Sequence, residues 1–418
     1  MRNAAYVMAA GLLFALAACA REERAPVSAP LQVRLGVEVA VSELPAVLAG
    51  KRVGLITNHS GRDHAGTSTI DLLHEHPGLE LVALYAPEHG IRGEATGHIA
   101  DEMDEKTGLP IYSLYGEHRK PTPEMLEGVE ALVFEAQDVG VRQYTYITTM
   151  AMGMQAAAEK GIPFVVLDRP NPIGGVVVEG NLLDPEYSNF AGYYPIASRH
   201  GMTIGELARM FNEEFGIGAD LTVVAMEGWR REAWFDDTDV PWVKPSPNLP
   251  TLEGAIHYPG TVFFEGTNVS EGRGSERPFE LIGAPWMSRA AEVADSMNAL
   301  GLAGVRFEAV EYDIAPGARK YGGEHLQGVR LVVTDRESYR PVTAALLLMD
   351  MIRRLHPAEF EWRGGNNPDS PGNYTLDRLI GTDRVRLAIE NGTLPALLEE
   401  WKADEEKFRA MRKPYLLY

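Results

Sequence analysis

The stretch ALVFEAQDVGVRQYTYITTMAMGMQAAAEKGIPFVVLD, residues 131–168, decides the fold class. It begins with an apolar run at 131–136 and ends with another at 163–168, and such runs are typical of strands buried on both faces. The residues at 144–161 between them have helical spacing and end at Gly161, a residue type that commonly terminates helices. A strand, a helix and a second strand in this order predict a parallel βαβ unit.

The same alternation extends in both directions from this stretch. The sequence predicts further strands at 53–57, 79–86, 111–115 and 221–226, and further helices at 67–76, 122–129 and 203–216. Strands that alternate with helices in this way favour an α/β fold. We therefore expect a Rossmann-like parallel sheet with helices on both faces.

The composition changes after Trp242. The segment KPSPNLPTLEGAIHYPGT, residues 244–261, is rich in proline and glycine and is expected to form a long loop or a boundary. Two strands (305–312 and 328–335), a helix (341–356) and an amphipathic helical stretch (393–417) are predicted beyond it. We expect the Rossmann-like domain to occupy residues 46–245 and a smaller α+β domain to occupy residues 246–418.

The N-terminal residues predict export. Arg2 precedes an apolar run at 4–18 that fits a signal peptide and is short for a transmembrane helix. The run ends in Leu-Ala-Ala-Cys at 16–19, which resembles a bacterial lipoprotein cleavage box, so residues 1–19 are expected to be a lipoprotein signal and Cys19 the lipidated residue. An ordinary signal peptide is the alternative. Residues 20–45 are expected to be a tether.

Cys19 is the single cysteine of the 418-residue chain, so a disulfide within the chain is impossible. We expect an exported protein that is lipid-anchored to the cell envelope, on the periplasmic side of the outer membrane where the cell has two membranes. The formal net charge of −20 repels nucleic acid and anionic lipid surfaces. Nucleic acid is therefore not an expected partner, and the lipid is the only expected contact with the membrane.

Polar clusters follow three of the predicted strands. They are APEHGIRG at 86–93, QDVGVRQYTY at 137–146 and DRPNPIGG at 168–175. Ligands of open α/β sheets bind beyond the carboxyl ends of the strands. The three loops are therefore expected to share one rim of the sheet and to form the functional site there.

Several function classes lack their usual sequence motifs. TNHSG stands at 57–61, where a dinucleotide-binding protein would have its glycine-rich loop, and the chain has neither a Walker loop nor a Gly-x-Ser-x-Gly elbow. No histidine, cysteine or carboxylate pair has the spacing of a zinc-binding helix, so we expect no metal and no cofactor, although a metal site built from separate loops stays open. Carboxylates near aromatic residues favour carbohydrate chemistry, in which one carboxyl protonates the leaving oxygen and a second group handles the anomeric carbon.

From about residue 50 to its C-terminus the sequence resembles the NamZ-type exo-β-N-acetylmuramidases, glycoside hydrolase family 171. The resemblance is carried by GLITNHSG (54–61), APEHGIRG (86–93), QDVGVRQYTYI (137–147), LDRPNPIGG (167–175), RHGMTIGELA (199–208), PSPNLPT (245–251) and YPGTVFFEGTNVSEGRGSERPFELIGAPW (258–286). One departure is Phe134-Glu135, where the family often has Phe-Asp, and this makes Glu135 a weak catalytic candidate.

The resemblance implies two domains, with the site on the Rossmann-like domain and the smaller domain walling the cleft. It also implies a glycosidase that removes β-1,4-linked N-acetylmuramic acid from the non-reducing ends of peptidoglycan-derived muropeptides or disaccharides, without a cofactor. Two other classes stay open. One is a muropeptide-binding lipoprotein without catalysis, and the other is a different cell-wall hydrolase, an amidase or a metal-dependent esterase.

The resemblance and the strand-end position together make Glu88 the first candidate for the general acid. Asp138 and Glu265 are the other catalytic candidates, and Glu179 is an alternative to Asp138 as the second carboxyl. The 2-acetamido group of the substrate is a further alternative, as an internal nucleophile.

Arg273 and Arg142 are the two candidates to bind the lactyl carboxylate of N-acetylmuramic acid, because a guanidinium matches a carboxylate bidentately. The complete set of residues predicted to contact the substrate is Asn58, His89, Arg142, Tyr144, Asp168, Asn171, Glu179, His200, Asn248, Asn268, Glu271 and Arg273.

Overall fold

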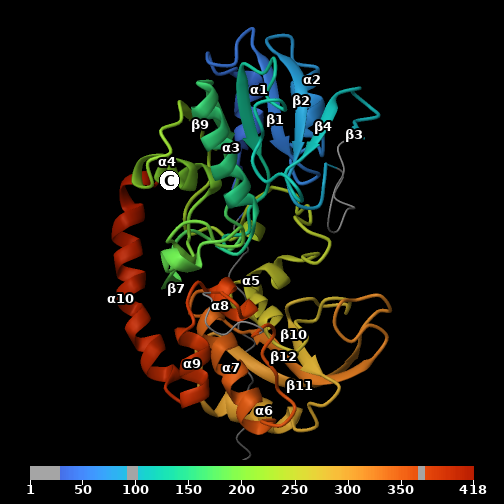
Figure 1. The fold of residues 1–418 in the computed structure, drawn as a ribbon, viewed down its shortest axis with the longest axis vertical. Coiled ribbons are helices and arrows are strands. Elements are labelled where there is room, and N and C mark those ends of the chain that lie inside the picture. The colour runs from blue at the N-terminus through green and yellow to red at the C-terminus, as the bar shows by residue number, and fades with distance from the viewer. Residues whose placement is uncertain (1–28, 92–101, 366–371) are drawn as a thin grey trace, which may run out of the picture.

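A computed structural model describes residues 29–91, 102–365 and 372–418. An N-terminal half that holds the large sheet lies above a smaller C-terminal half (Figure 1). The predicted signal with Cys19, and the first part of the predicted tether, lie outside the described residues. Within the described part, no helix is long and apolar enough to cross a membrane.

The large sheet has the order β3-β4-β2-β1-β5-β6-β9, and every neighbouring pair is parallel except β3 and β4. This confirms the predicted α/β class. Its strands are β1 (Arg52–Thr57), β2 (Glu80–Ala86), β3 (Glu102–Met103), β4 (Pro110–Ser113), β5 (Ala131–Glu135), β6 (Phe164–Leu167) and β9 (Leu221–Val224).

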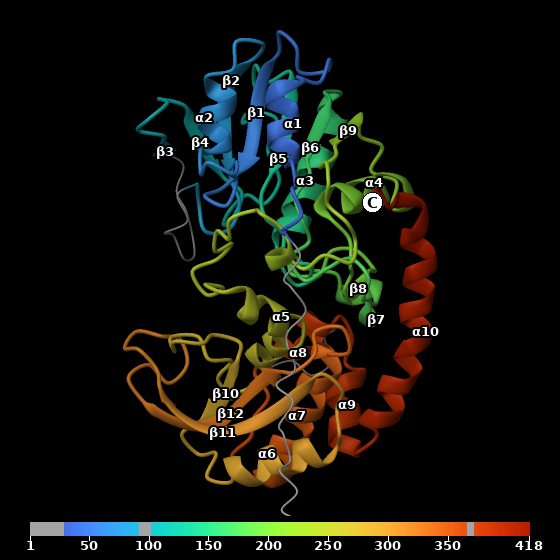
Figure 2. The ribbon, with the colours of Figure 1, turned by 180° about the vertical axis from the view of Figure 1, so that it is seen from behind.

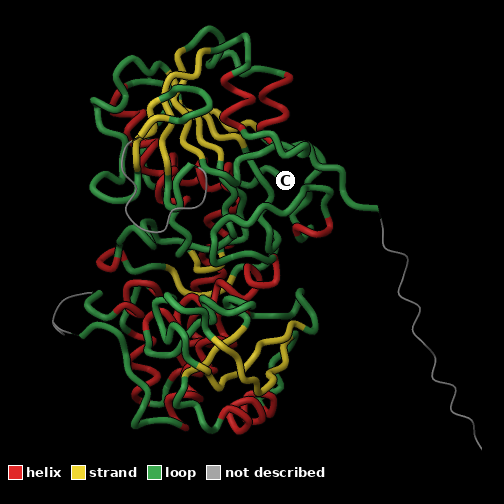
Figure 3. Tube along the Cα trace, turned by 90° about the vertical axis from the view of Figure 1, so that its right-hand side faces the viewer, coloured by secondary structure: helices red, strands yellow, loops and turns green. Residues whose placement is uncertain are grey.

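Helices cover both faces of this sheet because successive side chains of each strand point to opposite sides. On β5, Ala131 and Val133 pack with α1 (Gly36–Ser42) and α2 (Thr69–His74). Leu132 and Phe134 face the other way and pack with α3 (Tyr146–Lys160) and α4 (Ile204–Glu214). Figure 3 shows the strands of the sheet fanning across the upper half of the molecule.

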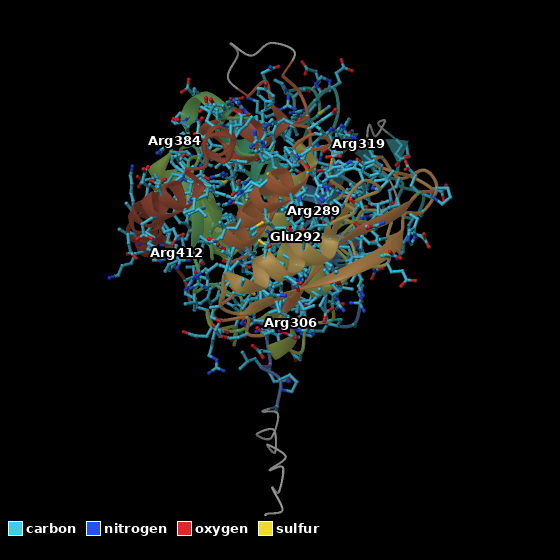
Figure 4. The ribbon with its side chains drawn as sticks, turned by 90° about the horizontal axis from the view of Figure 1, so that it is seen from below. Arg289, Glu292, Arg306, Arg319, Arg384 and Arg412 are labelled. Atoms are coloured by element: carbon cyan, nitrogen blue, oxygen red, sulfur yellow. The ribbon has the colours of Figure 1, made fainter. Side chains whose placement is uncertain are left out.

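The C-terminal half has a three-stranded antiparallel sheet of order β10-β12-β11. The strands are β10 (Leu281–Ala284), β11 (Val305–Asp313) and β12 (His325–Val333). The accompanying helices are α5 (Leu252–Thr261), α6 (Ala290–Ala299), α7 (Pro341–Leu355), α8 (Thr375–Ile380) and α9 (Arg384–Asn391). Helix α6 crosses the lower end of the molecule, where Arg289 and Glu292 form an ion pair at 2.6 Å (Figure 4).

The final helix, α10 (Leu394–Arg412), joins the two halves. It runs along one side from the C-terminal half back to the sheet domain (Figures 1 and 2) and packs against the ribbon of β7 (Glu179–Leu182) and β8 (Ala197–Arg199). Beyond this helix, the hydroxyl of the last residue, Tyr418, donates to Asp168 Oδ2 at 2.7 Å, next to β6. The chain terminus is therefore part of the larger domain.

Three local predictions differ from the structure. Residues 123–128 form turns instead of a helix, because the segment between Pro121 and Gly128 is too short to propagate one. Residues 252–261, expected as loop, form helix α5, which starts where Thr251 Oγ1 accepts a hydrogen bond from Gly254 N at 3.1 Å. The end of the predicted tether instead forms α1, because Leu35 and Val37 are apolar and become buried in the core.

Candidate active site

Glu88 lies just beyond the carboxyl end of β2, next to hydroxyl groups from two other segments. Thr145, at the start of α3, donates to Glu88 Oε2 at 2.8 Å. Tyr115, in the loop after β4, lies beside the same carboxylate, and burial together with the Glu88 charge raises the pKa of Tyr115 to about 12. The side chain is thus fixed at the rim of the sheet while remaining partly exposed.

The backbone next to Glu88 adopts a conformation that most residues avoid. His89 has a φ of 77° and Gly90 a φ of 69°, both in the left-handed region. Phe279, on the opposite wall, has a φ of 67°. Such backbone conformations concentrate at ligand-binding sites, where the surrounding structure holds them in place.

A pocket that is partly open to solvent lies between the two halves of the molecule. The sheet domain and residues 246–249 form one wall, and α5 and the residues after it form the other. The lining residues are Glu88, His89, Gln143, Tyr144, Thr145, Ser246, Asn248, Leu249, Tyr258, Arg273 and Phe279. The structure therefore brings Glu88, His89, Tyr144, Asn248 and Arg273 of the predicted set to one cavity.

Two buried tyrosines support this wall. Tyr144 and Tyr146 are in edge contact, with ring centroids 4.6 Å apart, and each donates its hydroxyl to Pro245 O at 2.9 Å. Asn58, a predicted contact residue, donates to the Tyr146 hydroxyl at 2.6 Å. Asn58 therefore acts on the pocket through Tyr146, beneath the lining residues.

The pKa of the Tyr258 hydroxyl is affected by all three candidate catalytic carboxylates. Burial raises this pKa well above the usual value, and the charge of Glu265 is the next largest cause. The charges of Glu88 and Asp138 raise the pKa further, whereas that of Arg273 lowers it. All three predicted catalytic carboxylates therefore lie within electrostatic reach of one pocket hydroxyl.

Arg273 is the centre of a balanced ion cluster. Its guanidinium donates to Glu265 at 2.6 Å and to Glu271 at 2.8 Å, and Lys320 donates to the other oxygen of Glu271 at 2.9 Å. Burial alone would raise the pKa of Glu271, but Lys320 and Arg273 outweigh it and hold that pKa well below its usual range. The guanidinium also lies 4.8 Å from the centroid of the Phe279 ring.

Asp138 follows β5 and is paired with His200. Its Oδ2 accepts a hydrogen bond from Gly140 N at 2.7 Å and lies 3.4 Å from His200 Nε2. His200 Nδ1 accepts from Met202 N at 3.2 Å, so the neutral ring carries its hydrogen on Nε2, toward the carboxylate. Asp138 Oδ1 is buried without a hydrogen-bond partner among the described residues. Asp138 is itself buried and, unlike Glu88, is not among the residues that line the pocket.

Four other predicted contact residues point elsewhere. Arg142 is fully buried and donates to the carbonyls of Asn181, Ile196 and Ile380, and burial lowers its pKa to about 9. Glu179 accepts hydrogen bonds from the first amides of α7. The remaining two hydrogen-bond to backbone groups. Asn171 donates to Met202 O and accepts from Ile173 N. Asn268 donates to Glu359 O and accepts from Glu361 N.

Asp168 is a fifth residue of this kind. It accepts hydrogen bonds from Thr203 Oγ1 at 2.7 Å, from Gly205 N at 2.8 Å and from the Tyr418 hydroxyl. Its carboxylate therefore joins β6 to the start of α4 and to the chain terminus, rather than lining the pocket. Glu135 is likewise completely buried, where it pairs with Arg169 and accepts from Thr69 Oγ1 at 2.8 Å.

Some residues of the site were not predicted as contacts. Tyr115, Thr145 and Tyr258 either lie beside Glu88 or line the pocket. Thr145 and Tyr258 lie inside two of the motifs quoted above, which is the one signal that pointed to them. Across residues 29–91, 102–365 and 372–418, no three histidine, cysteine or carboxylate side chains are placed to hold a metal ion.

Two family models match consecutive parts of the chain, and the boundary between them lies near the pocket. The profile described as the N-terminal part of the exo-β-N-acetylmuramidase NamZ matches residues 53–253. The profile described as the C-terminal part of the same protein matches residues 256–418. Both walls of the pocket are thus included in the matched regions.

Individual relatives agree with this result. The chain is 48% identical over 390 residues to the peptidoglycan β-N-acetylmuramidase NamZ of Bacillus subtilis strain 168, a match that covers 93% of this chain and 92% of the relative. Two crystal structures of DUF1343 family proteins from Bacteroides fragilis NCTC 9343 share the fold. One has a TM-score of 0.83 at 36% identity, covering 93% of this chain and 99% of that one. The other has a TM-score of 0.72 at 32% identity, covering 92% and 99%.

Proposed function

Because this chain belongs to the NamZ family of exo-β-N-acetylmuramidases, we propose that it hydrolyses the terminal N-acetylmuramic acid of peptidoglycan fragments in the pocket beside Glu88. The observation that carries the proposal is the position of Glu88. Its carboxylate lines the pocket, accepts a hydrogen bond from Thr145 and lies beside Tyr115. The substrate is a non-reducing terminal muramic acid linked β-1,4 to the next sugar.

Glu88 is the general acid in this proposal. It is partly exposed in the pocket, so a glycosidic oxygen is able to approach its carboxyl group. Thr145 fixes the orientation of the side chain, which a proton transfer in the transition state requires.

Asp138 is the second carboxyl. Its Oδ1 has no hydrogen-bond partner among the described residues, whereas both oxygens of Glu179 are used at the start of α7 and Glu265 is paired with Arg273. This oxygen is buried and outside the pocket lining, so in this proposal a water molecule or the acetamido N–H of the substrate reaches it after a local rearrangement. Either contact would support attack at the anomeric carbon.

The decisive experiment compares the wild type with Glu88→Gln on a chromogenic N-acetylmuramide and on a muramyl-glucosamine disaccharide. Loss of a general acid is expected to lower the rate of sugar release by about 10²- to 10⁴-fold. Glu213→Gln, an exposed carboxylate on α4, is the matched control and should retain the wild-type rate. Equal release by the wild type and Glu88→Gln would remove Glu88 from this role.

The same assay separates the rival classes. A muropeptide-binding protein without catalysis would bind the disaccharide saturably and release no sugar. A metal-dependent amidase or esterase would lose its activity after dialysis against a chelator. For the glycosidase proposed here, we expect sugar release that a chelator does not change.

We propose that the enzyme is exported and anchored to the envelope by a lipid on Cys19. The support is the Leu-Ala-Ala-Cys box at 16–19 after an apolar run, together with a peptidoglycan substrate that lies outside the cytoplasm. Cys19→Ser in the full chain should move the protein from the membrane fraction to the soluble fraction. An unchanged membrane fraction would contradict the lipid anchor.

A further inference from the structure

The proposed substrate carries a carboxylate that the pocket must recognise. N-acetylmuramic acid differs from N-acetylglucosamine by its lactyl group, whose carboxylate is matched best by a guanidinium. Within the described residues, Arg273 lines the pocket together with Glu88, and Arg119 lies near Tyr115. The inference below rests on the proposed function and asks which of the two binds the lactyl group.

Arg273 is poorly suited to bind another anion. Two carboxylates, Glu265 and Glu271, already occupy its guanidinium at 2.6 and 2.8 Å. Lys320 completes the cluster, which then has two positive and two negative charges. A third carboxylate would have to displace Glu265 or Glu271, or would lie beside them as a like charge.

Arg119 has the opposite properties. It is exposed, and within the described parts of the chain it forms no ion pair. Its guanidinium carbon lies 4.5 Å from the centroid of the Phe190 ring. A guanidinium stacked on an aromatic face is held in place, while the N–H groups around its edge remain free to donate.

Phe190 and Tyr115 connect Arg119 to the reacting carboxyl. The rings of Phe190 and Tyr115 are in contact, with centroids 5.9 Å apart. The Tyr115 hydroxyl in turn lies close enough to Glu88 for the Glu88 charge to raise the pKa of Tyr115. Arg119 is therefore connected to the general acid through Phe190 and Tyr115, although none of these three side chains is among the residues that line the pocket.

We propose that Arg119 binds the lactyl carboxylate of the terminal sugar and makes the enzyme select muramic acid over glucosamine. The anomeric carbon then faces Glu88 while the lactyl group, on the other side of the same ring, reaches toward Arg119. Phe190 holds the guanidinium in this orientation, and Tyr115 contacts Phe190 and lies beside Glu88.

The test compares wild type and Arg119→Gln on two substrates that differ only at the lactyl group. One is the chromogenic N-acetylmuramide, and the other is the same compound with its lactyl carboxyl blocked as a methylamide. Arg119→Gln should lower kcat/KM for the free acid by about 10- to 100-fold, the effect of losing hydrogen bonds to a charged group. The blocked substrate should be hydrolysed by both proteins at similar rates.

The controls separate this inference from the proposed function. Arg306→Gln removes another exposed arginine, from β11 in the C-terminal half (Figures 1 and 4), and should behave as wild type on both substrates. An equal loss on the free and the blocked substrate, or no loss on either, would overturn the assignment of Arg119. A wild type that hydrolyses neither muramide would instead refute the proposed function.

Discussion

The hydroxyl of Thr145 donates to Glu88 Oε2 across 2.8 Å, and this bond joins the start of α3 to the loop after β2. Thr145→Val keeps the shape of the side chain and removes the donor. We expect kcat to fall about 10-fold with little change in KM, because a positioning contact acts on the transition state. Thr145→Ser should restore most of the rate in the same assay. Failure of serine to rescue would point to a packing role instead.

Asp138→Asn tests the second carboxyl of the proposed mechanism. The change keeps the size of the side chain and the acceptor for Gly140 N, but it removes the negative charge. The rate of muramide hydrolysis is expected to fall by about 10²-fold or more. Asp220→Asn, at an exposed position before β9, is the control. Wild-type turnover by Asp138→Asn would exclude Asp138 and favour the acetamido group of the substrate as the internal nucleophile.

Arg273→Ala separates a role in the ion cluster from a role in recognition. Removing the guanidinium leaves Glu265 without its partner, and Glu271 with Lys320 alone. We expect urea unfolding to show a loss of about 2 kcal/mol, and the rates on muramide and glucosaminide to fall by the same factor. A selective loss on the muramide would show that Arg273 itself binds the lactyl carboxylate.

The fold class was predictable because a strand that is buried on both faces has a continuous apolar run in the sequence. The stretch 131–134 is apolar throughout because β5 is covered on one face by α1 and α2 and on the other by α3 and α4. Helix α5 has no such pattern in the sequence, because Pro259 and two glycines give its segment the composition of a loop. The parallel strands of the large sheet could therefore be placed from the sequence, whereas helices α1 and α5 could not.

The site was predictable only in part. Glu88 and Asp168 both follow strands, yet Glu88 lines the pocket and Asp168 binds Thr203 and Tyr418. Position at a strand end indicates the rim, but it does not tell whether a side chain faces the ligand or the protein. Tyr115 comes from a separate loop, so its contact with Glu88 depends on tertiary structure alone.

Asp168 should make stability depend on pH. Burial raises its pKa from 3.8 to about 6, so folding favours the protonated form. The stabilising contribution is complete below pH 3.8 and is lost as the pH rises through 6, a change of about 3 kcal/mol. Asp168→Asn cannot titrate. The difference in unfolding free energy, wild type minus variant, should therefore decrease between about pH 4 and pH 7 in urea titrations. A difference that is constant with pH would contradict this.

Glu179→Gln tests whether Glu179, and not Asp138, is the second catalytic carboxyl. It accepts hydrogen bonds from Val342 N at 3.2 Å and from Thr343 N at 2.8 Å, at the start of α7, and therefore connects β7 to the C-terminal half. Glu179→Gln replaces one acceptor oxygen by an amide group, which cannot accept from a backbone N–H. Loss of such a cap costs about 1 to 2 kcal/mol, which urea unfolding would measure.

Catalysis by folded Glu179→Gln should remain close to that of the wild type at a temperature well below its unfolding transition. This result is expected because both oxygens of Glu179 are used by the first amides of α7, whereas a second catalytic carboxyl would lose about 10² in rate on the same change. A variant that melts like the wild type but hydrolyses no muramide would place Glu179 in the reaction and displace Asp138 from it.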